Sequence, residues 1–338
     1  MIFVTGGTGL LGAHILVELS RKGEAIRALK RSSSDTALVH SIFEHYFGKE
    51  AEEKFNKIQW VDGDITDIVS LEEAAEGCNV YYHSAAIVSF EKKDFKEMMK
   101  VNKGGTANVV NLAVDKNIDH LVYVSSVAAL GRDGRNDVYT ENNKWKTTPE
   151  NSGYAVSKNS AEMEVWRGVE EGIPAVIVNP TIILGPGNWN ESSVTFFKTM
   201  SQGMSWYPPG KNGFVDARDV AKAATQLSEK RMFNERYITV GENASFKTLF
   251  TKIAESFGKK GPHKKVKKWM LALAWRIDGF LSFFGKERKV TKENSRSAMS
   301  TSIYANEKIK HAIGFEFHSL DETIENASSF FKKHHQLN

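Results

Sequence analysis

A tyrosine and a lysine four residues apart are the clearest sign of chemistry in this sequence. Tyr154 and Lys158 lie in a stretch of helical period, where a spacing of four places both side chains on one helix face. A free tyrosine has a pKa of about 10, roughly three units above neutral pH. Because a neighbouring cation lowers that pKa, the phenol becomes a more useful general acid or base. The pair predicts proton transfer at Tyr154.

Two hydroxyls stand where such a tyrosine needs a partner. Ser125 and Ser126 close an apolar run that predicts a strand over residues 121–125. In a parallel sheet, ligands bind beyond the carboxyl ends of the strands. A serine there can hold a substrate carbonyl while Tyr154 transfers the proton, which favours an enzyme acting on a carbonyl or an alcohol.

A glycine-rich loop near the N-terminus indicates a dinucleotide. The sequence Thr5-Gly6-Gly7-Thr8-Gly9-Leu10-Leu11-Gly12 follows a predicted strand and opens a predicted helix. Gly6 suits the tight turn, Gly9 lets the backbone approach a pyrophosphate, and Gly12 lets the helix pack closely on the strand. The helix N-terminus then offers free N–H groups and a partial positive charge to the phosphates. With a strand before it and a helix after it, the loop predicts an NAD(P) site.

The end of the second predicted strand bears on the choice of cofactor. An NAD site usually carries Asp or Glu there for the ribose hydroxyls, whereas this chain has Lys30 and Arg31. Cations facing the 2′-position favour a phosphate, because a charge-assisted Arg–phosphate contact is strong. NADP is therefore the expected cofactor. NAD stays open, since both side chains can instead point to solvent.

The elements that must position these residues alternate along the chain, and the alternation predicts an α/β fold with a doubly wound Rossmann sheet. The predicted strands are Ile2–Thr5, Ala25–Leu29, Ile58–Val61, Val80–Tyr82, Leu121–Ser125, Ala175–Val178 and Arg236–Val240. The predicted helices are Leu10–Arg21, Ser70–Glu76, Val101–Val114, Tyr154–Val169 and Ala217–Ser228. Near-continuous apolar strands indicate a parallel sheet covered on both faces.

After Pro180 the rhythm changes, and a second, smaller lobe is expected. Residues 1–180 predict the NAD(P)-binding domain, to which residues 216–241 return. Residues 181–215, rich in Gly, Pro, Trp and Phe, suit loops that build a binding surface. With the mostly helical residues 242–338 they form the expected substrate-binding lobe. Thr291–Asn294 and Ser319–Glu322 read as helix starts.

Composition excludes several function classes. The 338 residues carry a formal net charge of +4, well below the basic excess typical of nucleic-acid binding. Cys78 is the single cysteine, so an intrachain disulfide and a Cys-rich metal site are excluded, and the histidines show no metal spacing. His83 is expected to end a buried strand. The sequence shows no secretory signal pattern and no stretch long enough to span a bilayer, and a cytoplasmic location is expected.

Taken together, these motifs resemble the extended (atypical) branch of the short-chain dehydrogenase/reductase superfamily, of the NAD-dependent epimerase/dehydratase type. The resemblance covers essentially the whole chain. It rests on the glycine loop and the Ser, Tyr and Lys residues, and on the following stretches: Gly63-Asp64-Ile65-Thr66-Asp67, His83-Ser84-Ala85-Ala86, Asn102 with the residues that follow it, Asn179-Pro180 through Gly187, and Phe214-Val215-Asp216-Ala217-Arg218-Asp219.

The resemblance implies a role for each matching position. Tyr154 is the catalytic acid/base, Lys158 lowers its pKa and binds the nicotinamide ribose, Ser126 polarises the carbonyl, and Asn102 supports the surroundings of Lys158. The implied cofactor-binding residues are Thr5, Gly6, Thr8, Gly9, Leu10, Leu11, Gly12, Lys30, Arg31, Asp64, Ile65, Ala85, Ala86, Tyr154, Lys158, Asn179, Pro180 and Ile182.

Details of the motifs favour some groups of the family over others. Dehydratases place an Asp-Glu pair after the catalytic hydroxyl, whereas Ser126 is followed by Val127. Asn179-Pro180 with Gly185-Pro186 is more similar to the dihydroflavonol reductase and hydroxysteroid dehydrogenase group than to epimerases. An aromatic-rich segment 181–215 with few charges suits an apolar or aromatic carbonyl substrate. The expected substrate residues are Val88, Leu130, Trp189, Phe196 and Phe214.

Alternatives remain at this stage. The first is an NAD-dependent sugar-nucleotide epimerase, and the second is a non-catalytic dinucleotide sensor. Besides a small-molecule substrate, the resemblance implies a homodimer, and no nucleic-acid partner is expected. The lysine cluster Lys259–Lys268 beside the apolar stretch Trp269–Phe284 suits either a solvated edge or contact with an anionic membrane.

Overall fold

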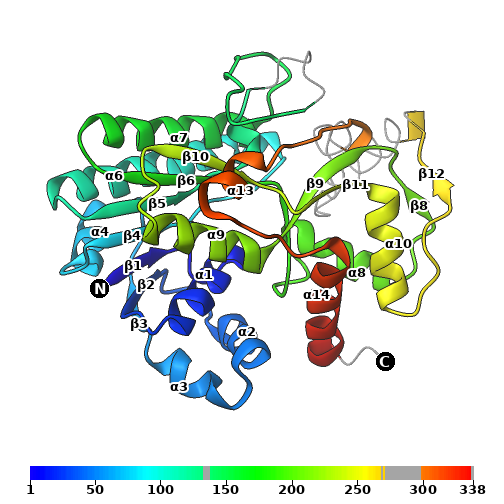
Figure 1. Cartoon of the computed structure of the whole chain (residues 1–338), viewed down its shortest axis with the longest axis horizontal. Helices are drawn as coiled ribbons and strands as arrows, with labels where there is room; N and C mark the ends of the chain where they lie inside the picture. The colour runs from blue at the N-terminus through cyan, green and yellow to red at the C-terminus, as the bar shows by residue number, and fades with distance from the viewer. Residues whose placement is uncertain (132–137, 268, 271–297, 336–338) are drawn as a thin grey trace.

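The computed structural model describes residues 1–131, 138–267, 269–270 and 298–335, and its centre is a parallel sheet (Figure 1). Seven strands pair in the order β10-β6-β5-β4-β1-β2-β3, with every neighbouring pair parallel. The strands are β1 (Ile2–Thr5), β2 (Ile26–Lys30), β3 (Gln59–Asp62), β4 (Val80–His83), β5 (His120–Val124), β6 (Ala175–Pro180) and β10 (Glu235–Thr239). The predicted α/β class and Rossmann arrangement are confirmed.

Helices cover both faces of this sheet, as near-continuous apolar strands require. The helices of the sheet domain are α1 (Leu10–Arg21), α2 (Ala37–Phe47), α3 (Ala51–Asn56), α4 (Ile68–Ala75), α5 (Phe95–Met98), α6 (Thr106–Asp115), α7 (Gly153–Glu170) and α9 (Ala217–Glu229). Alternate strand residues face opposite layers. Val4 belongs to the core cluster with α1, α2 and α9, and Phe3 to the cluster with α4, α6 and α7.

The order of the strands creates the place where a ligand is expected. The chain builds β1, β2 and β3 in one direction and then crosses to β4 on the other side of β1. Thr5 at the end of β1 pairs in register with His83 at the end of β4. The glycine loop and residues 84–86 therefore leave the sheet side by side. This reversal of strand order is the usual dinucleotide site of such sheets.

The C-terminal lobe continues the same core. Its elements are β7 (Ile182–Leu184), α8 (Thr195–Ser201), β8 (Trp206–Tyr207), β9 (Lys211–Asp216), β11 (Glu242–Ser245), α10 (Phe246–Ser256), β12 (Lys264–Lys265), α13 (Glu307–Ile313) and α14 (Leu320–His335). Strands β11, β9 and β7 form one small sheet, and β12 pairs with β8. Leu16 of α1 shares a core cluster with Phe246 of α10 and Phe331 of α14, so apolar packing runs through both parts of the chain.

Several local predictions can be compared with these elements. The helix start at Ser319 is confirmed: Ser319 Oγ accepts from the N–H of Glu322, and the Glu322 carboxylate accepts from the N–H of Ser319. Residues 181–215 were expected as loops but contain β7, α8, β8 and most of β9. The strands there form because β7 pairs with β9 and β8 pairs with β12. The helices α2 and α3 had no predicted counterpart. Thr291–Asn294 lies outside the described residues.

Candidate active site

The glycine loop has the shape of a phosphate cradle. Gly6 has φ of +74°, and a Cβ there would lie 2.6 Å from the backbone nitrogen of Ala85. A Cβ on Gly12 would lie 1.9 Å from the Gly6 carbonyl oxygen, so only glycine lets α1 approach the loop so closely. Gly9 is the N-cap of α1 and makes no side-chain cap. The loop and the uncapped helix start fit the pyrophosphate of a dinucleotide.

The two cations predicted at the end of β2, Lys30 and Arg31, have different surroundings. Lys30 Nζ lies 2.5 Å from Asp62 Oδ1 on β3, so its charge already has a partner. Arg31 is exposed and makes no ion pair within the described part of the chain. Burial would raise the pKa of Asp64, but hydrogen bonds from Thr66 and the charge of Arg31 outweigh it and lower that pKa. Of these two cations, Arg31 is the one without an ion pair to any described residue.

The structure brings the predicted catalytic hydroxyls together. Tyr154 is the second residue of α7, whose N-cap Ser152 accepts from the N–H of Ala155 at 3.0 Å. Ser126 follows β5 with an extended backbone, and its Oγ accepts from the N–H of Ala128 at 3.1 Å. Burial raises the pKa of Tyr154, and the nearby Ser126 hydroxyl opposes that rise. A carbonyl oxygen placed between these hydroxyls can be polarised by one and protonated by the other.

Lys158 lies one helical turn after Tyr154 and is 2% exposed. It donates at 2.9 Å to the hydroxyl of Tyr123 and at 2.9 Å to the carbonyl of Val124, both on β5. Burial lowers the pKa of Lys158 to about 7, although the charge of Glu162 acts in the opposite direction. The expected lowering of the tyrosine pKa is absent from this arrangement, because the ammonium is held by β5 and burial dominates at Tyr154.

Asn102 lies in a feature that the sequence did not reveal. Between α5 and α6 the chain forms a π-helical turn over Met99–Gly105, where a helix over Val101–Val114 was expected. The buried Asn102 amide accepts from the N–H of Ile87 at 2.7 Å and donates to its carbonyl at 2.9 Å and to Ser157 Oγ at 3.0 Å. Such π turns are frequent at functional sites. Asn102 thereby links the segment after β4 to the residue preceding Lys158.

Glu162, which the sequence analysis did not single out, is the centre of a buried network. Its carboxylate accepts from Ser125 Oγ at 2.5 Å, from Asn179 Nδ2 at 2.8 Å and from Arg236 at 2.9 Å. The Asn179 amide also donates to the Ser126 carbonyl at 3.1 Å. Glu162 stands four residues after Lys158, on the same helix face, and this spacing was the available signal.

The remaining predicted cofactor residues lie around this edge of the sheet. Asn179 and Pro180 are buried at the end of β6, and Ile182 is half-buried in β7. The Asn179 Oδ1 atom is buried without a hydrogen-bond partner in the described part of the structure. A buried acceptor without a partner is unusual, and it fits a donor supplied by a bound ligand. Ile65 is buried, and Ala86 is exposed after β4.

The predicted substrate residues do not form one surface. Phe214 and Leu130 are each 1% exposed, so in this structure they offer substrate no surface. Phe196 packs against Phe246 and Phe250 of α10. Trp189 stacks on His335 of α14, with ring centroids 3.7 Å apart. Val88 is exposed, on the segment that leaves β4.

Phe90, two residues beyond Val88, approaches Tyr154 and was not anticipated. Its ring centroid lies 5.9 Å from that of Tyr154. An aromatic ring at this distance makes the surroundings of the phenol apolar, which agrees with the effect of burial on the Tyr154 pKa.

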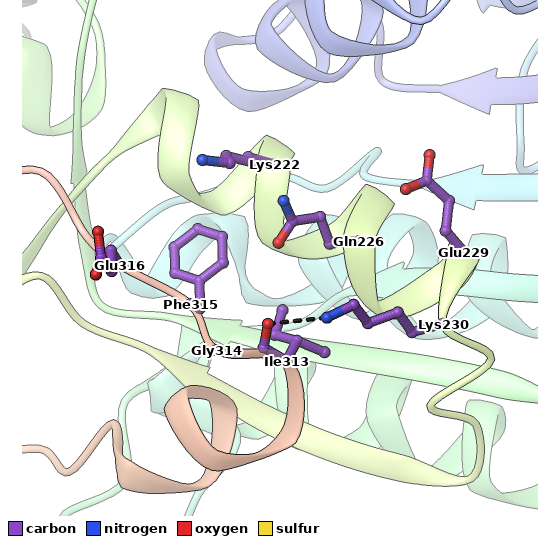
Figure 2. A pocket seen from close by; sticks show the side chains of 8 residues that line it. All are labelled: Lys222, Gln226, Glu229, Lys230, Ile313, Gly314, Phe315 and Glu316. Carbon is purple, nitrogen blue, oxygen red and sulfur yellow. Dashed lines mark hydrogen bonds between the residues drawn. The ribbon is translucent and has the colours of Figure 1, made fainter.

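Two other features lie apart from these residues. A pocket of about 280 Å³ between α9 and residues 313–316 is lined by charges of both signs and shares no residue with the predicted site (Figure 2). His83 ends the buried strand β4, as predicted, and bonds Thr5 Oγ1 at 2.6 Å and Thr106 Oγ1 at 2.9 Å. Among the described residues, no group of three or more His, Cys, Asp or Glu side chains could hold a metal ion.

Known proteins agree with this geometry. The sequence profile of the NAD dependent epimerase/dehydratase family matches residues 2–241. A putative dihydroflavonol 4-reductase from Synechocystis is 28% identical over 98% of this chain and 94% of its own length. The sterol demethylase protein B of Methylococcus capsulatus is 30% identical over 77% of this chain and 75% of its own.

A solved structure extends the agreement to the fold. The UDP-glucose 4-epimerase of Thermotoga maritima, in complex with UDP-glucose, superposes with a TM-score of 0.76 over 98% of this chain and 99% of its own, at 18% identity. At that identity the likeness concerns the fold alone. The family match spans the whole sheet domain, and with it the glycine loop, Ser126 and Tyr154. The chain belongs to the NAD dependent epimerase/dehydratase family and is an NAD(P)-dependent oxidoreductase.

Proposed function

We propose that this protein transfers hydride between NADP(H) and an apolar or aromatic ketone, aldehyde or secondary alcohol. The observation that carries the proposal is the proximity of Ser126 to Tyr154 at the start of α7, with the buried Lys158 one turn further along that helix. Ser126 follows the carboxyl end of β5, at the same end of the parallel sheet as the glycine loop after β1. A serine beside a tyrosine at this place supports carbonyl reduction, in which a positioned side chain transfers the proton.

Each residue has a separate task in the reduction. Ser126 donates a hydrogen bond to the substrate carbonyl, and Tyr154 transfers its phenolic proton to the same oxygen. A bound nicotinamide would supply the hydride to the carbonyl carbon. Once Tyr154 has given its proton to the oxygen, the product is the alcohol and Tyr154 is left as phenolate. Protonated Lys158 stabilises that phenolate by its charge, and Asn102 holds the neighbouring backbone in place.

The assignment of NADP rests on Arg31. Since Lys30 is paired with Asp62, Arg31 is the cation left to meet a 2′-phosphate. In the same proposal, residues 1–180 with 216–241 hold the cofactor, and residues 181–215 with 242–338 form the substrate lobe. We further propose a homodimer, for which light scattering is the direct measurement.

The apolar substrate class is supported by two relatives. One is named for dihydroflavonol reduction and the other for sterol demethylation. Around the tyrosine, Phe90 and the exposed Val88 are consistent with an apolar ligand.

The test is a substrate panel with a matched pair of variants. Wild-type protein is assayed on aryl ketones, aldehydes and sterol ketones with NADPH and NADH in parallel. Tyr154→Phe should lower kcat by about 10²- to 10⁴-fold while NADPH binding, followed by fluorescence, is retained. Tyr81→Phe is the control, because the buried Tyr81 hydroxyl has no hydrogen-bond partner among the described residues.

Three outcomes would overturn the proposal. Undiminished turnover in Tyr154→Phe would remove the mechanism. Co-purified NAD+ with epimerisation of UDP-glucose would replace the reaction. Cofactor binding without turnover on any substrate, in wild type and variant alike, would favour a sensor.

A further inference from the structure

A short strand pair, β8 with β12, lies at one end of the molecule (Figure 1). Its four residues are two aromatic residues and two lysines. Trp206 and Tyr207 form β8, and Lys264 and Lys265 form β12, in parallel register. Lys264 Nζ lies 5.7 Å from the ring centroid of Trp206. We call this pair, together with the neighbouring exposed residues Lys259, Lys260, Lys267 and Trp269, the β8–β12 surface.

The lysines of this surface have no carboxylate partners among the residues that the structure describes. Residues 258–270 contain six lysines and no Asp or Glu. The five lysines described there are exposed, and none makes an ion pair within the described part of the chain. Elsewhere, exposed lysines commonly pair, as Lys57 does with Glu53 at 2.6 Å. The local charge is therefore strongly positive although the whole chain carries only +4.

Two indoles stand among these charges. Trp206 is 40% exposed and Trp269 is 63% exposed. A single exposed aromatic residue is ordinary, but tryptophan beside lysine is the composition that settles at the headgroup level of a bilayer. The amphipathic ring sits at the interface while the ammonium groups meet anionic headgroups.

We propose that the β8–β12 surface docks the protein on a membrane containing anionic lipids. Among the described residues no helix is long and apolar enough to cross a bilayer, so the contact is peripheral. Nucleic acid is the competing partner for a basic, aromatic surface. Lipid is favoured because the formal net charge of the chain is only +4, well below the basic excess typical of nucleic-acid binding. The chain also runs on from Trp269 into a sequence whose only charges up to residue 284 are Arg276 and Asp278.

The test uses the full-length protein and sedimentation with vesicles. Phosphatidylcholine vesicles with and without about one third phosphatidylserine are compared at low and high salt. Each lysine near an anionic surface contributes about fivefold to partitioning. The variant K264E/K265E/K267E should therefore bind anionic vesicles at least 100-fold more weakly than wild type.

A second triple variant isolates position from net charge. K49E/K310E/K332E reverses three exposed lysines elsewhere on the described surface. Each reversal changes the charge by −2, so both triples move the formal net charge from +4 to −2. The control triple should bind the vesicles within threefold of wild type, and thermal melts of both triples confirm folding.

The two variants make the proposal falsifiable. Anionic-vesicle binding that high salt and K264E/K265E/K267E abolish, and that the control triple retains, supports it. Three results overturn it: no binding by wild type, equal loss in both triples, or equal binding to vesicles without phosphatidylserine. Preferential binding of a single-stranded oligonucleotide over the vesicles would also overturn it, in favour of nucleic acid.

Discussion

The end of β5 and the segment 181–215 both contributed residues to one expected active site, yet the structure treats them differently. At the end of β5, Ser126 and Lys158 are polar groups with defined hydrogen-bond partners, and Tyr154 lies close to Ser126. In the segment 181–215, Phe196 and Phe214 pack against α10 as part of the apolar core. One region arranges polar atoms and the other mainly fills volume.

The difference lies in what positions each group. Ser126 comes two residues after the end of β5, and Tyr154 is the second residue of α7. The regular geometry of these elements fixes where the two side chains lie. The aromatic residues were grouped by composition alone. Composition does not separate a core residue from a ligand-contacting one, since burial against protein and burial against substrate are driven by the same hydrophobic effect.

The largest expected effect tests the aromatic region. Phe214→Ala should lower the free energy of unfolding by about 3–5 kcal/mol, because a fully buried ring leaves a cavity. The KM for substrate of the folded enzyme should stay within twofold of wild type. Urea unfolding and steady-state kinetics at a temperature well below the melting point measure the two effects separately.

Val88→Ala is the matched variant for this comparison. Val88 is 49% exposed, so its truncation should change the free energy of unfolding by less than about 0.5 kcal/mol. Val88 lies two residues before Phe90, whose ring centroid is 5.9 Å from that of Tyr154. The KM for an apolar substrate should therefore rise several-fold. A raised KM in Phe214→Ala with no change in Val88→Ala would reverse the assignment of the two residues.

Much of the fold could be predicted from local sequence. The helix Leu10–Arg21 has the predicted bounds, and the start at Ser319 was legible from its capping pattern. Because α7 connects the parallel strands β5 and β6, its first turn with Tyr154 is expected at the end of the sheet where Ser126 follows β5. The π turn at Asn102 was not predictable, because it depends on bonds to Ile87 across the fold. Glu162 was missed because its partner Arg236 lies 74 residues away in the chain.

The next prediction concerns Glu162, whose carboxylate accepts hydrogen bonds from Ser125, Asn179 and Arg236. Glu162→Gln removes the carboxylate that Arg236 and Asn179 share and should lower the free energy of unfolding by about 2 kcal/mol. The charge of Glu162 also raises the pKa of Lys158. Without it the lysine loses its proton at lower pH, so the alkaline limb of the kcat/KM profile should move to lower pH.

The control for Glu162 lies on the same helix. Glu164 pairs with Arg167 at 3.0 Å near the surface, so Glu164→Gln should cost less than about 1 kcal/mol and leave the pH profile in place. If Glu162→Gln lowers stability without moving the profile, its role is structural only.

The smallest effect compares two buried histidines that lie beside the two regions: His83 stacks on Tyr123 of β5, and His14 lies next to Gly185 of the segment 181–215. Burial lowers the pKa of His83, at the end of β4, to about 3 and that of His14, which bonds Tyr46 beside α14, to about 4. Well above pH 6.5 both the folded and the unfolded chain carry these histidines neutral, and their contribution to stability is complete. Below pH 6.5 the unfolded chain binds protons that the folded chain excludes, so stability falls as the pH drops toward 4.

As the pH is lowered from 7 to 5.5, proton uptake by each histidine in the unfolded chain should reduce the free energy of unfolding by about 1 kcal/mol. One proton corresponds to about 1.4 kcal/mol per pH unit. Urea unfolding at a series of pH values measures the slope. His83→Gln and His14→Gln should each reduce it, and the same change at the exposed His311 should not. A slope that survives in the double variant would show that other groups, and not this buried pair, set the acid sensitivity of both regions.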